Sequence, residues 1–216
     1  MSRAEIVKEI KNNGIVAIIR TKHPDKLIKI AEAIFEGGVK FIEITMTVPN
    51  ALKMIEKVRK SVSNKIILGV GSVLDPDTAQ KAIDAGAQFV VSPVFKKEII
   101  DKAHKNNVPA MPGTFTPTEM FNAHQYGADV IKVFPADILG MKFFKGVKAP
   151  MPDLNLMPTG GVNLDNAGDW IKAGACAVGI GTALLDVKAI EENNYKKLTE
   201  NARRINDSIK SAVNKN

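Results

Sequence analysis

Lys132 and Glu43 are the residues of this chain whose positions most directly indicate chemistry. Each is the one charged side chain in a short apolar segment, Lys132 in Val130–Phe134 and Glu43 in Phe41–Thr45. Burial disfavours the ammonium form of a lysine and favours the neutral amine, the nucleophile that forms a Schiff base with a carbonyl compound. A carboxyl group beside it can accept and return protons. Together the two residues predict imine chemistry with acid and base assistance.

Two explanations without catalysis remain open at this point. A lysine near the end of a strand can extend its ammonium group to water, and Lys132 with Glu43 can form a buried ion pair of structural value only. Side chains alternate along a strand, so Glu43 shares a face with Thr45, and Lys132 shares a face with Phe134. If both faces point into one interior, the two ionisable groups belong to one site.

The elements that must position these residues follow one repeated pattern: an amphipathic helix, a break that often contains glycine, and a short apolar strand. The glycines at these breaks supply the left-handed turn that ends a helix. The predicted strands are Gly14–Ile19, Val39–Thr45, Ile66–Val70, Gln88–Val91, Val108–Met111, Asp129–Phe134, Asn155–Pro158 and Cys176–Ile180. They are mostly continuous apolar runs, as expected for strands that are covered on both faces.

This alternation predicts an α/β fold, a (β/α)8 TIM barrel formed by residues 1–216 as a single domain. A helix over Arg3–Asn12 precedes the first strand, and a helix over Tyr195–Val213 follows the last. An open doubly wound sheet is the alternative. Such a sheet usually carries a glycine fingerprint after its first strand, and the segment Arg20-Thr21 that follows Gly14–Ile19 has none. The barrel is therefore favoured.

Composition limits the class of protein. The chain has 216 residues, of which 45% are hydrophobic and 25% charged, as in ordinary globular proteins. Its net charge of +7 falls mostly on helical segments, and with 6% aromatic residues we expect no nucleic-acid partner. We find no membrane-length apolar stretch and no secretory signal at the start. The single Cys176 excludes an internal disulfide, so we expect a cytoplasmic protein. His23, His104 and His124 lack metal-ligand spacing, and no metal is expected.

The carboxyl ends of the strands form the working face of such a barrel. Glycines gather there after the last two strands, as Gly160-Gly161 and as Gly181-Thr182. Backbone N–H groups that are free of Cβ atoms and lie at helix N-termini bind anions well, so these two segments predict a phosphate site. The pair Gly69 and Gly71 lacks the third glycine of a dinucleotide site, and a packing role is favoured for it.

At this point the chain resembles a known family, the class I 2-keto-3-deoxy-6-phosphogluconate (KDPG) aldolases, many of which also act as 4-hydroxy-2-oxoglutarate (KHG) aldolases. The resemblance runs nearly end to end. It is carried by Ile42-Glu43-Ile44-Thr45, Gly69-Val70-Gly71-Ser72-Val73, Val91-Ser92-Pro93, Met111-Pro112-Gly113, Thr116-Pro117-Thr118-Glu119, Ile131-Lys132-Val133-Phe134-Pro135 and Pro158-Thr159-Gly160-Gly161-Val162. The resemblance implies a (β/α)8 barrel that assembles as a homotrimer and uses no metal or other cofactor beyond the covalent lysine.

By this resemblance Lys132 matches the Schiff-base lysine and Glu43 the general acid and base. Many members have an arginine where this chain has Thr47, and that arginine holds the pyruvate carboxylate. Arg20, at the end of the first strand, is our candidate for this role, since a guanidinium binds a carboxylate bidentately. The expected substrate-binding residues are Arg20, Thr47, Ser72, Pro93, Phe134, Thr159, Gly160, Gly161, Gly181 and Thr182.

The expected reaction is the cleavage of a phosphorylated 2-keto acid to pyruvate and glyceraldehyde 3-phosphate, and also of 4-hydroxy-2-oxoglutarate. Three alternatives remain. A sister aldolase would act on the 6-phosphogalactonate epimer. A sugar-phosphate epimerase or decarboxylase on the same fold would form no imine. A non-catalytic barrel that binds a phosphate ligand would keep the glycine segments and show no turnover.

Overall fold

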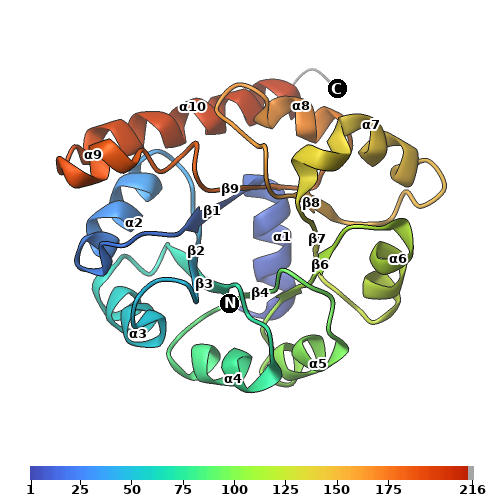
Figure 1. Ribbon diagram of the computed structural model, residues 1–216, viewed down its shortest axis with the longest axis horizontal. Coiled ribbons are helices and arrows are strands. Elements are labelled where there is room, and N and C mark those ends of the chain that lie inside the picture. Colours follow the sequence, from blue (N-terminus) through green and yellow to red (C-terminus); the bar gives the residue numbers. More distant parts are fainter. Residues whose placement is uncertain (214–216) are drawn as a thin grey trace.

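The structure is a computed structural model that describes residues 1–213, and it has an α/β fold in which every strand pair is parallel. Figure 1 shows the strands around a common centre, with α1 across that centre and the other helices outside the strands. In chain order the elements are α1 Arg3–Asn13, β1 Ile15–Ile19, η1 Pro24–Lys26, α2 Leu27–Glu36, β2 Phe41–Thr45, α3 Ala51–Ser61, β3 Ile67–Gly71, α4 Pro76–Asp84, β4 Val90–Val91, α5 Lys97–Lys105, β5 Ala110–Met111, β6 Gly113–Thr114, α6 Pro117–Gln125, β7 Ile131–Val133, α7 Ala136–Lys148, β8 Leu156–Pro158, α8 Ala167–Lys172, β9 Val178–Ile180, α9 Val187–Glu191 and α10 Tyr195–Val213.

The α/β prediction is confirmed, while the prediction of one barrel sheet with eight strands is met only in part. The strands form a six-stranded sheet in the order β5-β4-β3-β2-β1-β9 and a three-stranded sheet in the order β6-β7-β8. Pro112, which has no N–H to donate, separates β5 from β6. On the other side one isolated bridge, between Thr159 and Gly179, links β8 to β9.

Each predicted strand overlaps an observed strand, and β6 was not predicted. β3 has the predicted length but is shifted by one residue, and the other observed strands are shorter than predicted. The segment Asp129–Phe134, for example, forms a ladder only over Ile131–Val133. The two flanking helices lie where they were expected. The turn glycines also behave as predicted: Gly38, Gly86, Gly127 and Gly174 all have left-handed φ angles. Side chains cap two of the helix starts, Thr116 with Glu119 at α6 and Asp75 at α4.

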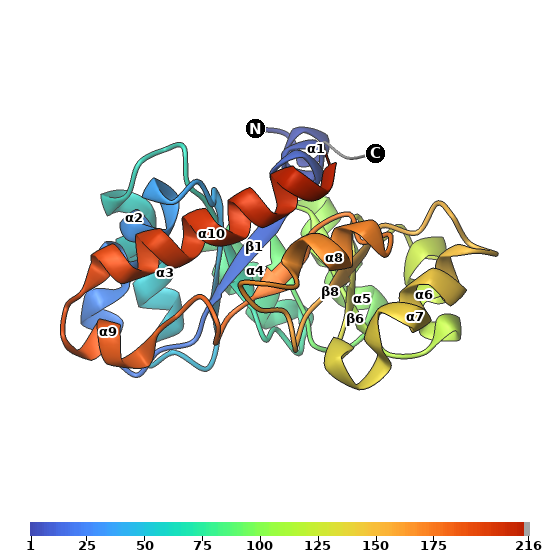
Figure 2. The same ribbon diagram turned by 90° about the horizontal axis from the view of Figure 1, so that it is seen from above.

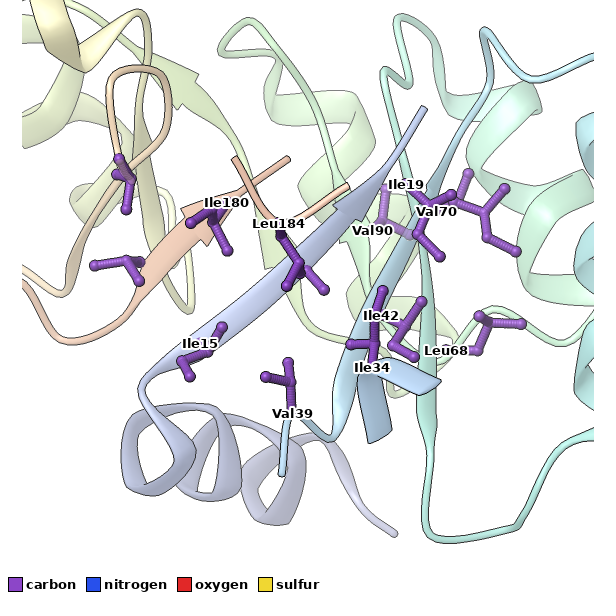
Figure 3. Packing of buried hydrophobic residues seen from close by; sticks show 14 of the residues in the cluster. Ile15, Ile19, Ile34, Val39, Ile42, Leu68, Val70, Val90, Ile180 and Leu184 are labelled. Atoms are coloured by element: carbon purple, nitrogen blue, oxygen red, sulfur yellow. The ribbon is translucent and has the colours of Figure 1, made fainter. Parts of the chain in front are cut away.

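The larger core lies between the strands and the outer helices. Figure 3 shows buried side chains of the strands, among them Ile19, Ile42 and Val70, in the same cluster as Ile34 of α2 and Leu184. Full burial of one such side chain contributes about 1.5–3 kcal/mol relative to its exposure. This outer packing holds the strands in place while leaving their other faces free to form a second layer.

The second layer lies on the inner faces of the strands, and we call it the apolar interior layer. Helix α1 covers it, and Figures 1 and 2 show this helix across the centre of the strands and at one edge of the molecule. The layer consists of Val16, Phe41, Ile67, Phe89, Val91, Met111, Val130, Met157 and Ala177, together with Ile6 and Ile10 of α1. Alternation places the next inward residue of each strand two positions further on, toward the carboxyl ends.

An ion pair fixes α1 at the amino ends of the strands. Arg3 of α1 donates through Nε to a carboxylate oxygen of Asp129 at 2.8 Å, and His104 lies 3.0 Å from the other oxygen. That second oxygen also accepts from the backbone N–H of Ala110 at 2.9 Å. The amino ends of the strands are therefore closed by packing and by charge. Among residues 1–213, no helix is both long and apolar enough to cross a membrane.

Candidate active site

Glu43 and Lys132 occupy the inward positions directly after the apolar interior layer. Glu43 follows Phe41 by two residues on β2, and Lys132 follows Val130 by two residues on β7. Figure 1 shows β2 and β7 on opposite sides of the strand arrangement. We call the group formed by Glu43, Thr45, Gly71, Lys132, Thr159 and Gly179 the polar interior layer.

Glu43 is the most deeply buried charged residue of this layer. It is 1% exposed, and neither carboxylate oxygen has a hydrogen-bond partner. Its space comes from Gly71, because a Cβ atom on Gly71 would lie 1.6 Å from Oε1 of Glu43. Burial raises the pKa of the Glu43 carboxyl, while the nearby charges of Lys132 and Arg20 oppose that rise. The carboxyl is thus disposed to hold a proton and to exchange it.

Lys132 is 6% exposed, so its side chain does not extend into bulk water. Its Nζ lies 5.1 Å from the centre of the Phe134 ring, which itself is partly exposed. A side chain of the neighbouring strand anchors the backbone at this residue, because Thr114 donates through its hydroxyl to the Lys132 carbonyl at 3.0 Å. Neither Lys132 nor Glu43 lines the pocket at the carboxyl ends of the strands, whereas Phe134, two residues after Lys132, does line it.

That pocket has a volume of about 1000 Å³ and opens at the carboxyl ends of the strands. Of the residues predicted to bind substrate, those that line it are Arg20, Thr47, Phe134, Thr159, Gly160, Gly161, Gly181 and Thr182. Ser72 and Pro93 are not among its lining residues. Ser72 follows Gly71 with a left-handed φ of 60°, and the backbone of Pro93 lies against Gly113. These two residues belong to the side of the interior near Glu43 and β4.

The glycine segments differ from the prediction in one respect. They do not lie at helix N-termini, because α8 begins at Ala167 and α9 at Val187, several residues after Gly161 and Gly181. Gly160 and Gly161 have left-handed φ angles of 94° and 71°, and a Cβ on Gly161 would lie 2.5 Å from that of Asp137. Gly160, Gly161 and Gly181 line the pocket as loop residues. An anion bound there would contact the loop backbone and would not lie at the N-terminus of α8 or α9.

Several residues of the pocket were missed by the sequence reasoning. Lys22 adds to the charge of Arg20 on one wall, where His23 also lies, and Val187 and Glu191 of α9 form another wall. The loop after β1 and the helix α9 come together because Lys26 donates through Nζ to the carbonyls of Ile190 and Glu191, at 2.8 and 3.1 Å. These residues follow their strands by several positions, so strand periodicity gave no signal for them.

Thr159 combines burial with an unused hydroxyl. It is 7% exposed, its Oγ1 has no hydrogen-bond partner, and it lines the pocket. A Cβ on Gly179 would lie 2.4 Å from that oxygen, so the glycine is what admits the threonine side chain. An unsatisfied buried hydroxyl costs free energy, and a ligand oxygen at this position would recover it.

Two further observations concern Cys176 and metal-binding side chains. Burial raises the pKa of the Cys176 thiol to about 11, which keeps it in the unreactive thiol form. Within residues 1–213, no three His, Cys, Asp or Glu side chains come together in a way that could hold a metal ion. His104, one of the histidines considered, instead pairs with Asp129 at the opposite end of the strands.

Comparison with known proteins identifies the family. The model of the KDPG and KHG aldolase family matches residues 6–201, and the chain belongs to this family. A 2-dehydro-3-deoxy-6-phosphogalactonate aldolase of Escherichia coli is 31% identical over 79% of this chain and 83% of that protein. A KHG/KDPG aldolase of the same organism is 30% identical over 88% of this chain and 89% of that protein.

Solved structures give the same picture. A KDPG aldolase from Legionella pneumophila, solved with pyruvate captured as a covalent carbinolamine, superposes with a TM-score of 0.85 at 26% identity, over 92% of this chain and 97% of that one. A native KDPGal structure superposes with a TM-score of 0.85 at 28% identity, over 93% and 96%. Both superpositions extend over more than nine tenths of this chain, so the whole fold is similar to that of these aldolases.

Proposed function

We propose that this protein is a class I aldolase that cleaves 2-dehydro-3-deoxy-6-phosphogluconate to pyruvate and glyceraldehyde 3-phosphate through an imine on Lys132. It also cleaves 4-hydroxy-2-oxoglutarate to pyruvate and glyoxylate. The observation that carries the proposal is the pair of buried ionisable groups on β2 and β7: an amine, and a carboxyl whose two oxygens have no hydrogen-bond partner. The family and the carbinolamine captured in a relative support the same chemistry.

Imine formation is the first step. The neutral Lys132 amine attacks the C2 carbonyl, and a proton moves from nitrogen to oxygen to give a carbinolamine. Glu43, whose pKa is raised by burial, donates its proton to the departing hydroxyl, so water leaves and an iminium cation remains. Glu43 is then ionised, at the moment when the substrate needs a base.

Carbon–carbon cleavage follows from this state. The Glu43 carboxylate takes the proton of the C4 hydroxyl, the C3–C4 electron pair moves into the iminium, and the aldehyde leaves. The protonated Glu43 then returns its proton to C3 of the enamine, and water hydrolyses the resulting iminium to pyruvate and free Lys132. Glu43 thus alternates between two protonation states, which suits a carboxyl whose pKa lies above its usual value.

Substrate binding divides between two parts of the pocket. Arg20 and Thr47, which follow β1 and β2, are proposed to hold the carboxylate of the keto acid, with Ser72, Pro93 and Phe134 around the pyruvyl group. The phosphate would lie against the backbone near Thr159, Gly160, Gly161, Gly181 and Thr182. In the same pocket Lys22 favours an anionic ligand through its charge, and His23 does so through the N–H group of its ring.

A second substrate is favoured by a specific observation, the 31% identity to a 2-dehydro-3-deoxy-6-phosphogalactonate aldolase. The two sugar acids differ in the configuration at C4, the carbon whose hydroxyl Glu43 deprotonates. Comparative kinetics on the two epimers decides between them, since the preferred epimer has the higher kcat/KM.

We also propose that the two sheets close into one (β/α)8 barrel in a single domain, and that the cytoplasmic protein is a homotrimer. The bridge between Thr159 and Gly179 and the hydrogen bond from Lys132 N–H to the Pro112 carbonyl support closure on both sides. Exposed apolar side chains on successive loops, Leu74, Val94 and Phe115, support a contact between copies. Sedimentation equilibrium measures the assembly.

Turnover tests the proposed function directly. The purified protein is incubated with the 6-phosphogluconate-derived keto acid, and pyruvate release is followed with lactate dehydrogenase and NADH. We expect turnover that needs no added metal and survives a chelator. A protein that releases no pyruvate from either phosphorylated epimer or from 4-hydroxy-2-oxoglutarate would contradict the proposal, and would favour a non-catalytic binder.

A further inference from the structure

Thr45 is a buried residue of the polar interior layer that the proposed mechanism does not use. It is the last residue of β2, it is 1% exposed, and it pairs in register with Gly71 of β3. Its hydroxyl has two neighbours. One is Oγ1 of Thr47, at 2.7 Å, and the other is the carbonyl oxygen of Ile19, at 3.3 Å. Thr45 therefore connects the end of β1, directly before Arg20, with the exposed Thr47.

The two distances differ in what they imply. A separation of 2.7 Å is a normal length for a hydrogen bond between hydroxyls, whereas 3.3 Å is longer than the usual O–H···O range. The hydroxyl of Thr45 has one proton, so it donates either to Ile19 or to Thr47. When it donates to Ile19, Thr47 must donate to Thr45 to keep the shorter bond. When it donates to Thr47, the proton of Thr47 is free for another acceptor.

A carboxylate accepts hydrogen bonds and donates none. From this geometry we infer that Thr45 is a positioning residue for recognition of the substrate carboxylate. When the carboxylate arrives beside Arg20, Thr45 gives up its long bond to Ile19 and donates to Thr47, which then donates to the carboxylate. A chain of such bonds is cooperative, because each donor polarises the next. The inference rests on the proposed function, since it needs a 2-keto acid at this end of the pocket.

The variants Thr45→Val and Thr45→Ser separate a role of the hydroxyl from a role of the side-chain volume. The measurement is the pyruvate concentration that half-saturates borohydride trapping on Lys132. Thr45→Val keeps the proton of Thr47 but removes the partner that orients and polarises the Thr47 hydroxyl, so we expect this concentration to rise roughly 3- to 10-fold. The trapping rate at saturation should change little. Thr45→Ser keeps the hydroxyl and should stay near the parent protein.

A ketone without a carboxylate separates an effect on carboxylate recognition from a general effect on imine formation. Trapping of hydroxyacetone on Lys132 should be the same in Thr45→Val as in the parent, because nothing in that ligand uses the proton of Thr47. Thr199→Val is the matched control: Thr199 of α10 also donates its hydroxyl to a backbone carbonyl, that of Ala33 at 2.9 Å, and lies outside the pocket. It should leave both half-saturating concentrations unchanged.

Three results would overturn the inference. Thr45→Val with an unaltered half-saturating pyruvate concentration would do so, as would an equal effect on pyruvate and hydroxyacetone, which marks a structural role. Thr45→Ser behaving like Thr45→Val would show that the hydroxyl is not the cause. If instead the parent protein traps no pyruvate on Lys132, the proposed function fails as well, and this outcome is distinct because it appears before any variant is made.

Discussion

The two interior layers of this protein use the same strands and differ in almost every property. On β2 the apolar layer holds Phe41, and two residues further on the polar layer holds Glu43. Met157 of β8 is followed in the same way by Thr159, the residue directly after that strand. The apolar layer is filled by large side chains and covered by α1, whereas the polar layer contains unpartnered oxygens and lies beside a pocket of about 1000 Å³.

The difference shows how a short parallel strand serves stability and chemistry at once. Close packing at the amino ends fixes the backbone, so that the next inward residues are held in place without partners of their own. Glycine makes the second layer possible, since Gly71 and Gly179 leave the space that Glu43 and Thr159 occupy. Variants in the two layers should therefore fail in different ways, by loss of activity in one and by loss of stability in the other.

The largest effect is expected for Lys132→Arg. An arginine keeps the positive charge but offers no neutral amine, so no imine forms, and kcat/KM should fall by a factor on the order of 10⁴ or more. The measurement is pyruvate release from the phosphorylated keto acid. Lys145→Arg, at an exposed position of α7, is the control and should keep full activity. Substantial residual activity in Lys132→Arg would mean that another lysine carries the imine.

Glu43→Gln should lower kcat by about 10²–10⁴-fold, the usual contribution of a positioned acid or base. Because Lys132 is intact, the variant should still form an imine. The expected signature is slow exchange of the pyruvate methyl protons in deuterated water, measured by proton NMR, with a borohydride adduct still detectable. An unchanged exchange rate would assign the proton transfer to another group.

A change in the apolar layer should act on stability. Phe89 is fully buried, and its ring lies 6.2 Å from that of Phe41. Truncation in Phe89→Ala should lower the free energy of unfolding by about 3–5 kcal/mol, measured by urea denaturation. The kcat of the folded fraction, assayed well below the melting temperature, should remain within a few-fold of the parent. A specific loss of kcat at unchanged stability would contradict the division between the layers.

The smallest effect is a pH dependence of stability that also decides the ion-pair alternative. Burial raises the pKa of Glu43 above its ordinary value of 4.5. Below pH 4.5 the carboxyl is protonated in the folded and the unfolded chain, so Glu43→Gln should match the parent. As the pH rises, the unfolded carboxyl ionises first and the parent loses stability relative to the variant, until the pH passes the native pKa.

Urea denaturation of both proteins at pH 4, 6 and 8 measures this difference. A variant that becomes more stable than the parent with rising pH supports a strained, proton-exchanging carboxyl. A variant that becomes less stable with rising pH would mean that a Glu43–Lys132 ion pair stabilises the fold, since a stabilising pair lowers the carboxyl pKa.

The sequence predicted which residues share a strand face better than it predicted how the strands pair and where the loops lie. Strand faces follow a period of two, so spacing identified which residues share a face with Glu43 and with Lys132 and left open that both faces point into one interior. Sheet division was not predictable in this way, because it depends on the single missing N–H of Pro112 and on a one-bridge contact at Thr159. Strand lengths were overestimated because a buried apolar residue need not belong to a ladder.

The pocket walls beyond the strand ends were largely outside the reach of sequence reasoning. Lys22, His23 and Glu191 lie there because of the tertiary contact between Lys26 and the end of α9, and no local pattern encodes that contact. Asn163 also lines this pocket, and its Oδ1 accepts from the backbone N–H groups of Asp165 and Asn166 in a turn before α8 begins.

One measurement tests the central claim most directly. The protein is incubated with pyruvate, reduced with borohydride, digested and analysed by mass spectrometry, with Lys132→Arg treated in parallel. The account predicts one stoichiometric adduct on Lys132 and no adduct in the variant. An adduct on a different lysine, or no adduct in the parent protein, would contradict the assignment of Lys132 as the residue that forms the imine.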